Sequence, residues 1–217
     1  MPTPTFETPT FETPTIETPT FELLAISDRA GLDIPFPEWL GRLAAAGVGA
    51  VQVREKDLDD RAVYELVRQA RAVLSTVLVN GRVDLALAAG ADGAHLPADG
   101  VPVAALRRRF GADVLLGVST HSVEEVERAM RDGADYVTFG PVWPTPSKER
   151  YGPPLGTGEL ARAARVGIPV YALGGVMLSR FGEAAAAGAA GVAGIRLFQG
   201  PALEEVVNAA RQCFAKG

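Results

Sequence analysis

Three polar residues with long side chains stand two positions apart in the segment Gln52-x-Arg54-x-Lys56. Side chains alternate between the two faces of a strand, so a strand over this segment would point all three in one direction. An amide and two cations that converge in one place suit an anionic ligand. We therefore favour a substrate-binding site here over a solvated strand end.

His121 is followed by Ser122 and, three residues later, by Glu125, which is the spacing of a helix capping box. Its imidazole would lie just outside the helix N-terminus, where the helix dipole disfavours the charged form. A neutral imidazole near pH 7 can act as a general base, so we predict a catalytic role for His121. The other histidine, His95, precedes Leu-Pro and is interpreted as a packed residue at a strand end.

Glycines end two consecutive strand-like runs, Val170–Leu173 and Gly191–Ile195. Glycine exposes backbone N–H groups, and barrels commonly bind phosphate after their seventh and eighth strands. The predicted phosphate-binding residues are Gly174, Gly175, Gly194, Ile195 and Arg196.

Further polar residues end another run or lie in the long loop over residues 140–158, and we predict that they contact substrate. They are Asn80, Thr145, Ser147 and Lys148. The sequence has no cluster of His, Cys or carboxylates with metal-ligand spacing, so these residues alone predict neither a metal nor a cofactor.

Eight strand-like runs alternate with eight helical stretches, which predicts a parallel sheet. The runs are Leu23–Ser27, Ala50–Arg54, Thr76–Asn80, Gly93–Leu96, Val114–Val118, Tyr136–Phe139, Val170–Leu173 and Gly191–Ile195. Eight such units predict an α/β fold, a single-domain TIM (β/α)₈ barrel over residues 23–217. A doubly wound open sheet is the alternative.

Residues 1–22 repeat Thr-Pro-Thr-(Phe/Ile)-Glu, and we expect a disordered tail because proline recurs every fifth residue.

The net charge of −5 includes four glutamates of this tail, so the rest of the chain is near −1. Neither nucleic acid nor a membrane surface is implied. Cys213 is the single cysteine, which excludes an intrachain disulfide. No run reaches transmembrane length, and a cytoplasmic location is expected. Homodimerisation stays open.

The chain resembles the thiamine phosphate synthase/TenI superfamily from about Leu23 onward. The matching segments are Val51-Gln52-Val53-Arg54-Glu55-Lys56, Asn80-Gly81-Arg82-Val83-Asp84, Gly117-Val118-Ser119-Thr120-His121-Ser122, Gly133-Ala134-Asp135-Tyr136-Val137-Thr138-Phe139-Gly140-Pro141-Val142-Trp143-Pro144-Thr145 and Ala172-Leu173-Gly174-Gly175. The resemblance implies a TIM barrel and a small phosphorylated thiazole as substrate.

The resemblance implies two chemistries. Synthases of this superfamily join a pyrimidine pyrophosphate to thiazole phosphate with Mg²⁺, and their metal aspartates stand where this chain has Gly81 and Gly100. TenI-type tautomerases aromatise a carboxythiazole phosphate without metal, and they share Asn-Gly-Arg-Val-Asp, Leu-Pro and a histidine before serine. We therefore expect a metal-independent thiazole tautomerase with His121 as acid/base. The alternatives are a Mg²⁺-dependent thiamine phosphate synthase and a catalytically silent thiazole-phosphate-binding protein.

Overall fold

The structure is a computed structural model that describes residues 21–145 and 153–214. Residues 1–20 of the repeat tail lie outside this part of the chain. Ser147 and Lys148, which we expect to contact substrate, lie outside it as well, so the predictions for all of these residues stay predictions.

Eight parallel strands close into a barrel in the order of the chain. The first and last strands pair with Leu24 opposite Ala193, which completes the closure. The strands are β1 (Leu23–Ile26), β2 (Ala50–Val53), β3 (Thr76–Asn80), β4 (Gly93–Leu96), β5 (Leu115–Thr120), β6 (Tyr136–Phe139), β7 (Val170–Ala172) and β8 (Gly191–Gly194). The closed order confirms the predicted TIM barrel and excludes the open sheet.

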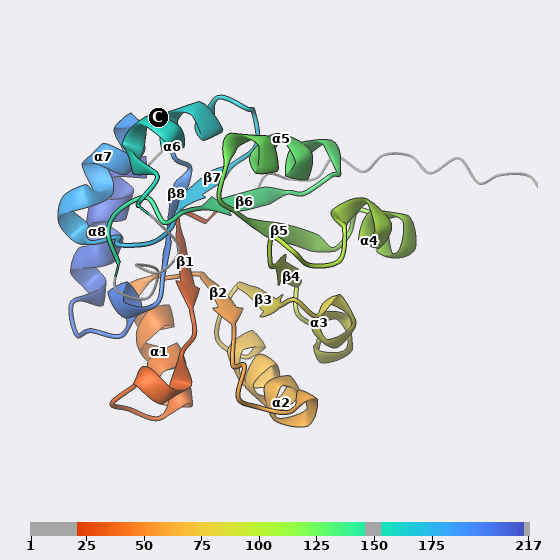
Figure 1. Cartoon of the computed structure of the whole chain (residues 1–217). Helices are drawn as coiled ribbons and strands as arrows, with labels where there is room; N and C mark the ends of the chain where they lie inside the picture. The colour runs from red at the N-terminus through yellow and green to blue at the C-terminus, as the bar shows by residue number, and fades with distance from the viewer. Residues whose placement is uncertain (1–20, 146–152, 215–217) are drawn as a thin grey trace, which may run out of the picture.

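A helix follows each strand, and the helices surround the barrel (Figure 1). They are α1 (Phe36–Ala46), α2 (Asp60–Arg71), α3 (Val83–Ala89), α4 (Val103–Phe110), α5 (Val123–Arg131), α6 (Gly156–Ala164), α7 (Phe181–Ala186) and α8 (Leu203–Phe214). The described residues also form three short 3₁₀ helices that were not predicted: η1 (Arg29–Gly31), η3 (Leu178–Arg180) and η4 (Arg196–Phe198). They follow β1, β7 and β8, so they add backbone to the end of the barrel where an active site is expected.

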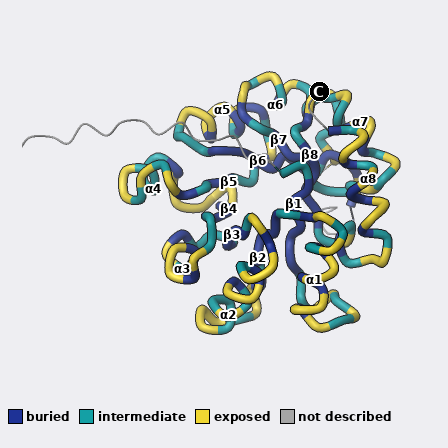
Figure 2. Tube along the Cα trace, turned by 180° about the vertical axis from the view of Figure 1, so that it is seen from behind, coloured by how far each residue is buried: buried dark blue, intermediate teal, exposed yellow. Residues whose placement is uncertain are grey.

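Buried side chains form a layer between strands and helices and a second layer inside the barrel. The tube in Figure 2 is accordingly dark blue, the colour of buried residues, along much of the strands. In β1, Leu24 and Ile26 point into the barrel while Leu23 and Ala25 face the helices, as alternation along a strand requires. Burial of apolar surface in both layers is the main force that holds the closed sheet together.

Aromatic rings fill the lower part of the barrel interior. The ring of Phe21 stacks on Tyr171 at 4.9 Å, and the Tyr171 hydroxyl donates a 2.6 Å hydrogen bond to the Phe21 carbonyl. Tyr136 meets Tyr171 edge to face. A Cβ atom at Gly117 would lie 2.1 Å from the Tyr136 ring, so only glycine leaves room for this tyrosine. Phe21 thus closes one end, and the opposite end is left for ligands.

Within residues 21–145 and 153–214, no helix combines the length and apolar character needed to cross a membrane.

Candidate active site

The carboxyl ends of the strands carry most of the residues that the sequence selected. Gln52 lies within β2, Asn80 is the last residue of β3, and Gly194 ends β8. His121 directly follows β5. Because parallel strands point the same way around the barrel, these residues gather at one end, which we call the barrel mouth.

A buried carboxylate that the sequence did not single out organises one side of the mouth. Glu55 is 8% exposed, and its Oε1 accepts a 2.6 Å hydrogen bond from Ser27 Oγ. Both Glu55 carboxylate oxygens also accept from the backbone N–H of Arg29 at 3.1 Å. Ser27 Oγ in turn accepts from the backbone N–H of Arg54 at 2.8 Å. This network fixes the backbone that follows β1 and β2. Glu55 thereby positions its two sequence neighbours, Arg54 and Lys56.

Gln52 and Asn80 meet inside the mouth. Gln52 is 2% exposed, and its Nε2 donates a 3.0 Å hydrogen bond to Asn80 Oδ1. Within the described part of the chain, the buried Oε1 of Gln52 has no hydrogen-bond partner. A buried acceptor without a donor is costly, so a ligand that brings an N–H group here would gain binding free energy. The geometry supports the substrate-binding prediction for this pair.

His95 lies on β4 in the barrel interior, as its interpretation as a packed residue requires. It is 3% exposed, and burial lowers the pKa of its imidazole to about 3. Nδ1 lies 2.9 Å from the Tyr136 hydroxyl, and Nε2 lies 3.0 Å from Ser119 Oγ. Because burial raises the pKa of Tyr136 well above its ordinary value, that hydroxyl keeps its proton. The tyrosine can therefore donate to Nδ1, which leaves Nε2–H to donate to Ser119.

The neutral state of His95 predicts a pH dependence of stability. The pKa of this imidazole falls from 6.5 in the unfolded chain to about 3 in the fold, so the unfolded state binds the proton more readily between these values. Its contribution is complete above pH 6.5 and decreases as the pH falls toward 3, by up to about 1.4 kcal/mol per pH unit. Chemical unfolding at pH 7, 6 and 5 measures this slope. His95→Gln is expected to flatten it, and an unchanged slope in that variant would assign the dependence to other groups.

The capping box predicted after His121 is present. Ser122 is the N-cap of α5 and its Oγ accepts from the Glu125 backbone N–H at 3.2 Å, while Glu125 Oε2 accepts from the His121 backbone N–H at 2.6 Å. The imidazole is exposed, and its Nδ1 donates to the Gly140 carbonyl at 2.5 Å. This bond ties the β5 end to the β6 end and leaves Nε2 toward solvent.

Gly174 and Gly175 follow β7 in a tight turn. Both have positive φ, +87° and +67°, a region that L side chains rarely adopt. A Cβ atom at Gly174 would lie 2.6 Å from Pro141, and one at Gly175 would lie 2.6 Å from the Pro144 carbonyl. Within the described residues, neither glycine N–H donates a hydrogen bond to the protein. Two backbone donors in one turn, without a partner among the described residues, would suit a phosphate, and phosphate binding at this turn stays a prediction.

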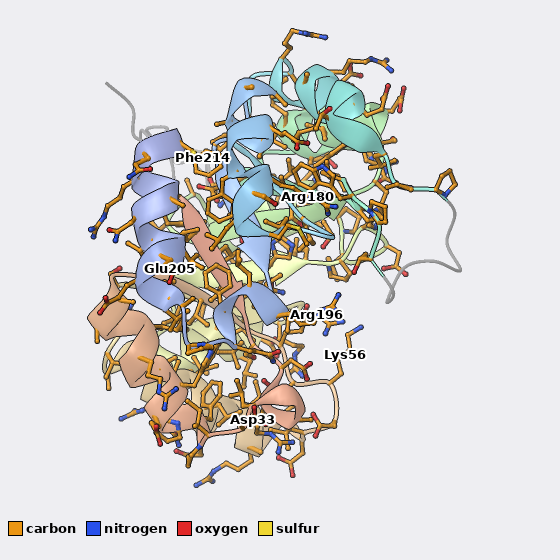
Figure 3. All side chains as sticks on the ribbon, turned by 90° about the vertical axis from the view of Figure 1, so that its left-hand side faces the viewer. Asp33, Lys56, Arg180, Arg196, Glu205 and Phe214 are labelled. Carbon is orange, nitrogen blue, oxygen red and sulfur yellow. The ribbon has the colours of Figure 1, made fainter. Side chains whose placement is uncertain are left out.

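Arg196 and Thr145 cross the mouth above the β7 turn. Arg196 begins η4 after β8, and its Nη2 donates a 3.2 Å hydrogen bond to Thr145 Oγ1 in the loop after β6. Strand β7 lies between β6 and β8, so the guanidinium spans the glycine turn. Arg196 and Lys56 project from the same end of the barrel (Figure 3). The mouth thus combines free backbone donors with positive side chains.

Comparison with known proteins places this barrel in a family. Residues 23–198 match the profile of the family described as thiamine monophosphate synthase. The chain belongs to this family. A Geobacter sulfurreducens protein named "Putative thiamine-phosphate synthase" is 50% identical over 154 residues, which cover 69% of this chain and 72% of that protein. The thiamine-phosphate synthase of Anaeromyxobacter dehalogenans is 44% identical over 170 residues, which cover 76% and 77%.

A solved structure gives the same result. The thiamine phosphate pyrophosphorylase from Pyrococcus furiosus superposes with a TM-score of 0.81 at 29% identity, over 90% of this chain and 98% of that one. Family members at up to 50% identity are thus named synthases, which overturns our expectation of a thiazole tautomerase. The acid/base role of His121 in tautomerisation falls with that expectation, while the catalytic role inferred from its place before α5 stays a prediction. The error came from treating two missing carboxylates as evidence for a different reaction.

The carboxylates near the mouth do not fit a divalent cation. At the two positions where the resemblance places metal aspartates, this synthase-family chain has glycine. Asp84 is held by Arg82 through two hydrogen bonds of 2.9 and 2.8 Å, which lower the pKa of that carboxyl to about 2. Glu55 is engaged by Ser27 and the Arg29 backbone. Among the described residues, no three His, Cys, Asp or Glu side chains are grouped to hold a metal ion.

Proposed function

We propose that this chain is a thiamine phosphate synthase, a transferase that joins a pyrimidine pyrophosphate to a thiazole phosphate. The observation that supports it best is the high identity to relatives that carry this name. The barrel mouth offers the donors and acceptors that two phosphorylated substrates would need.

The pyrimidine is assigned to Gln52 and Asn80. The ring of thiamine carries an amino group, and the buried Oε1 of Gln52 is an acceptor that such a group would satisfy. The hydrogen bond from Gln52 Nε2 to Asn80 holds the amide in the orientation that leaves this oxygen available. Ser119, oriented by neutral His95, provides a further polar contact at the same level of the barrel.

The thiazole phosphate is assigned to the turn after β7. Gly174 and Gly175 present their N–H groups there, and Gly194 and Ile195 bring backbone from β8 beside them. Backbone donors neutralise a phosphate without a counter-charge that would have to move during the reaction. This arrangement would hold the thiazole at a fixed distance from the pyrimidine.

The pyrophosphate is assigned to the cations after β2. Arg54 and Lys56 have no side-chain hydrogen bond or ion pair to any described residue, so both are free to meet an anion. In the reaction, the bond from the pyrimidine methylene carbon to the pyrophosphate oxygen breaks and its electron pair leaves with the oxygen. The lone pair of the thiazole nitrogen forms the new C–N bond. Positive groups placed around the leaving oxygens stabilise the charge that develops on them.

Mg²⁺, which the family resemblance implies, would also lower this charge when bound, but the carboxylates among residues 21–145 and 153–214 do not form a site for it. The steps above therefore rest on the side chains and backbone groups of the chain itself.

A growth experiment tests the proposal in the cell. A bacterial strain that lacks its own thiamine phosphate synthase is expected to grow without added thiamine when it expresses this chain. The Anaeromyxobacter dehalogenans enzyme is the positive control. If the control restores growth and the folded chain does not, the synthase assignment fails, and a silent thiazole-phosphate-binding protein would be the better description.

A further inference from the structure

Pro97 lies beside both glycines that follow β3 and β4, and it crowds the Cβ position of one of them, Gly100. A Cβ atom at Gly100 would lie 3.0 Å from Pro97 Cδ and 3.0 Å from the Pro97 carbonyl oxygen. A Cβ atom at Gly81 would lie 3.8 Å from the same Cδ, and its φ of +70° disfavours any side chain. The Pro97 ring therefore stands beside both glycines, and at Gly100 it leaves no room for aspartate without a shift.

The barrel mouth, from the end of β8 to the end of β2, carries positive charge that no described carboxylate neutralises. Arg82 is paired with Asp84 and Asp60, and Arg29 is paired with Asp57. By contrast, Arg54, Lys56 and Arg196 form no ion pair with any carboxylate of the described residues. These cations lie at the barrel mouth and have no described counter-charge. They therefore indicate an anionic ligand that carries several charges.

We propose that Arg196, together with Lys56, supplies the leaving pyrophosphate with positive charge that the described carboxylates are not placed to supply through a bound metal ion. The inference rests on the proposed synthase function. Arg196 is suited to this work because its planar guanidinium can donate two parallel hydrogen bonds to phosphate oxygens and stays charged at any working pH. Arg196 is exposed, and its bond to Thr145 Oγ1 directs the side chain toward the loop after β6.

The proposal describes how the leaving group is released. As the carbon–oxygen bond breaks, its electron pair becomes negative charge on the pyrophosphate oxygen, and the guanidinium and ammonium groups donate hydrogen bonds to the phosphate oxygens. No proton is transferred in this step, because the thiazole nitrogen attacks through its lone pair and carries the positive charge in the product. Arg196 touches the leaving group, so its effect is on both pyrophosphate binding and turnover.

Calorimetric titration of inorganic pyrophosphate into the full chain, in buffer with EDTA, tests this inference apart from catalysis. We expect the wild type to bind pyrophosphate without a divalent ion. In Arg196→Ala, the dissociation constant for pyrophosphate should be about 10- to 100-fold larger. Arg196→Lys is expected to recover part of the loss. Arg165→Ala, an exposed arginine after α6 at the opposite end of the barrel, is the matched control with the same change in charge and should bind as the wild type.

Several results would overturn the inference. The inference fails if the wild type binds pyrophosphate only after Mg²⁺ is added. It also fails if Arg196→Ala and the wild type bind pyrophosphate equally tightly. A third is a loss in Arg196→Ala that affects titration of thiazole phosphate but not of pyrophosphate, which would assign the arginine to the other substrate. Mn²⁺ titration followed by electron paramagnetic resonance, without pyrophosphate, should detect no bound ion, and a bound ion would show that the carboxylates do chelate. Failure of the synthase assignment is recognised separately, by absence of thiamine phosphate formation with pyrophosphate binding intact.

Discussion

Arg54→Ala is expected to lower kcat/KM for the pyrimidine pyrophosphate by about 10²–10³, the usual cost of removing a group that stabilises developing charge. The backbone of Arg54 is fixed by its hydrogen bond to Ser27 Oγ, and Ser27 is held by buried Glu55. The side chain itself is bonded to nothing else in the described part of the chain. Its loss should therefore reduce activity with little effect on folding.

Two further measurements separate charge from structure in this variant. The midpoint of thermal unfolding of Arg54→Ala should stay close to that of the wild type, since the side chain packs into no core cluster. Arg165→Ala, at the exposed C-terminal end of α6 and at the opposite end of the barrel, removes the same charge away from the mouth and should leave kcat/KM unchanged. A loss below about threefold in Arg54→Ala would remove this arginine from the leaving-group site, because such a loss is small beside that of a lost electrostatic contact.

Gly175→Ala is expected to damage both binding and stability. The new methyl group would lie 2.6 Å from the Pro144 carbonyl oxygen and 2.8 Å from Trp143 Cβ, and the positive φ would add backbone strain. Overpacking and a left-handed alanine together cost about 2–5 kcal/mol of unfolding free energy. Because the turn must open to accept the methyl group, the KM for thiazole phosphate should rise by at least about tenfold, equivalent to the loss of one good hydrogen bond.

Chemical unfolding and steady-state kinetics measure the two effects. Gly182→Ala is the matched control: Gly182 lies in α7, its Cβ position is open, and alanine favours helix, so this variant should be as stable as the wild type or more stable. If Gly175→Ala bound thiazole phosphate normally while only its stability fell, the glycine would serve the packing of the loop and the phosphate would lie elsewhere.

The barrel could be predicted from sequence because its signals are local. Alternation of short apolar runs with helical stretches predicts parallel strands, and the eight expected runs match the eight strands to within a few residues. Period two in Gln52-x-Arg54-x-Lys56 predicts one face for all three residues; Gln52 is buried within β2, but the strand ends at Val53, so the structure does not extend this alternation to Arg54 and Lys56. The 3₁₀ helices could not be predicted, since three residues carry too little periodicity.

The contacts that arrange the site could not be predicted, because they join distant parts of the chain. Glu55 reaches Ser27 across 28 positions, and His95 reaches Tyr136 across 41. Nothing in the sequence near Glu55 distinguishes it from an exposed glutamate.

The reaction was mispredicted for a chemical reason. Gly81 and Gly100 show that two carboxylates are absent, and we treated that absence as loss of the synthase reaction. A leaving pyrophosphate must have positive charge near its oxygens. Guanidinium and ammonium groups provide the same type of stabilisation as a metal ion. The relevant question was which cations remain at the mouth, and Arg54, Lys56 and Arg196 were already visible in the sequence.

The central claim is tested most directly by mixing purified protein with the pyrimidine pyrophosphate and thiazole phosphate and following all phosphorus signals by ³¹P nuclear magnetic resonance. We predict that thiamine phosphate and inorganic pyrophosphate appear in equal amounts as both substrates decline. Persistence of both substrates, while a known synthase consumes them under the same conditions, would contradict the account.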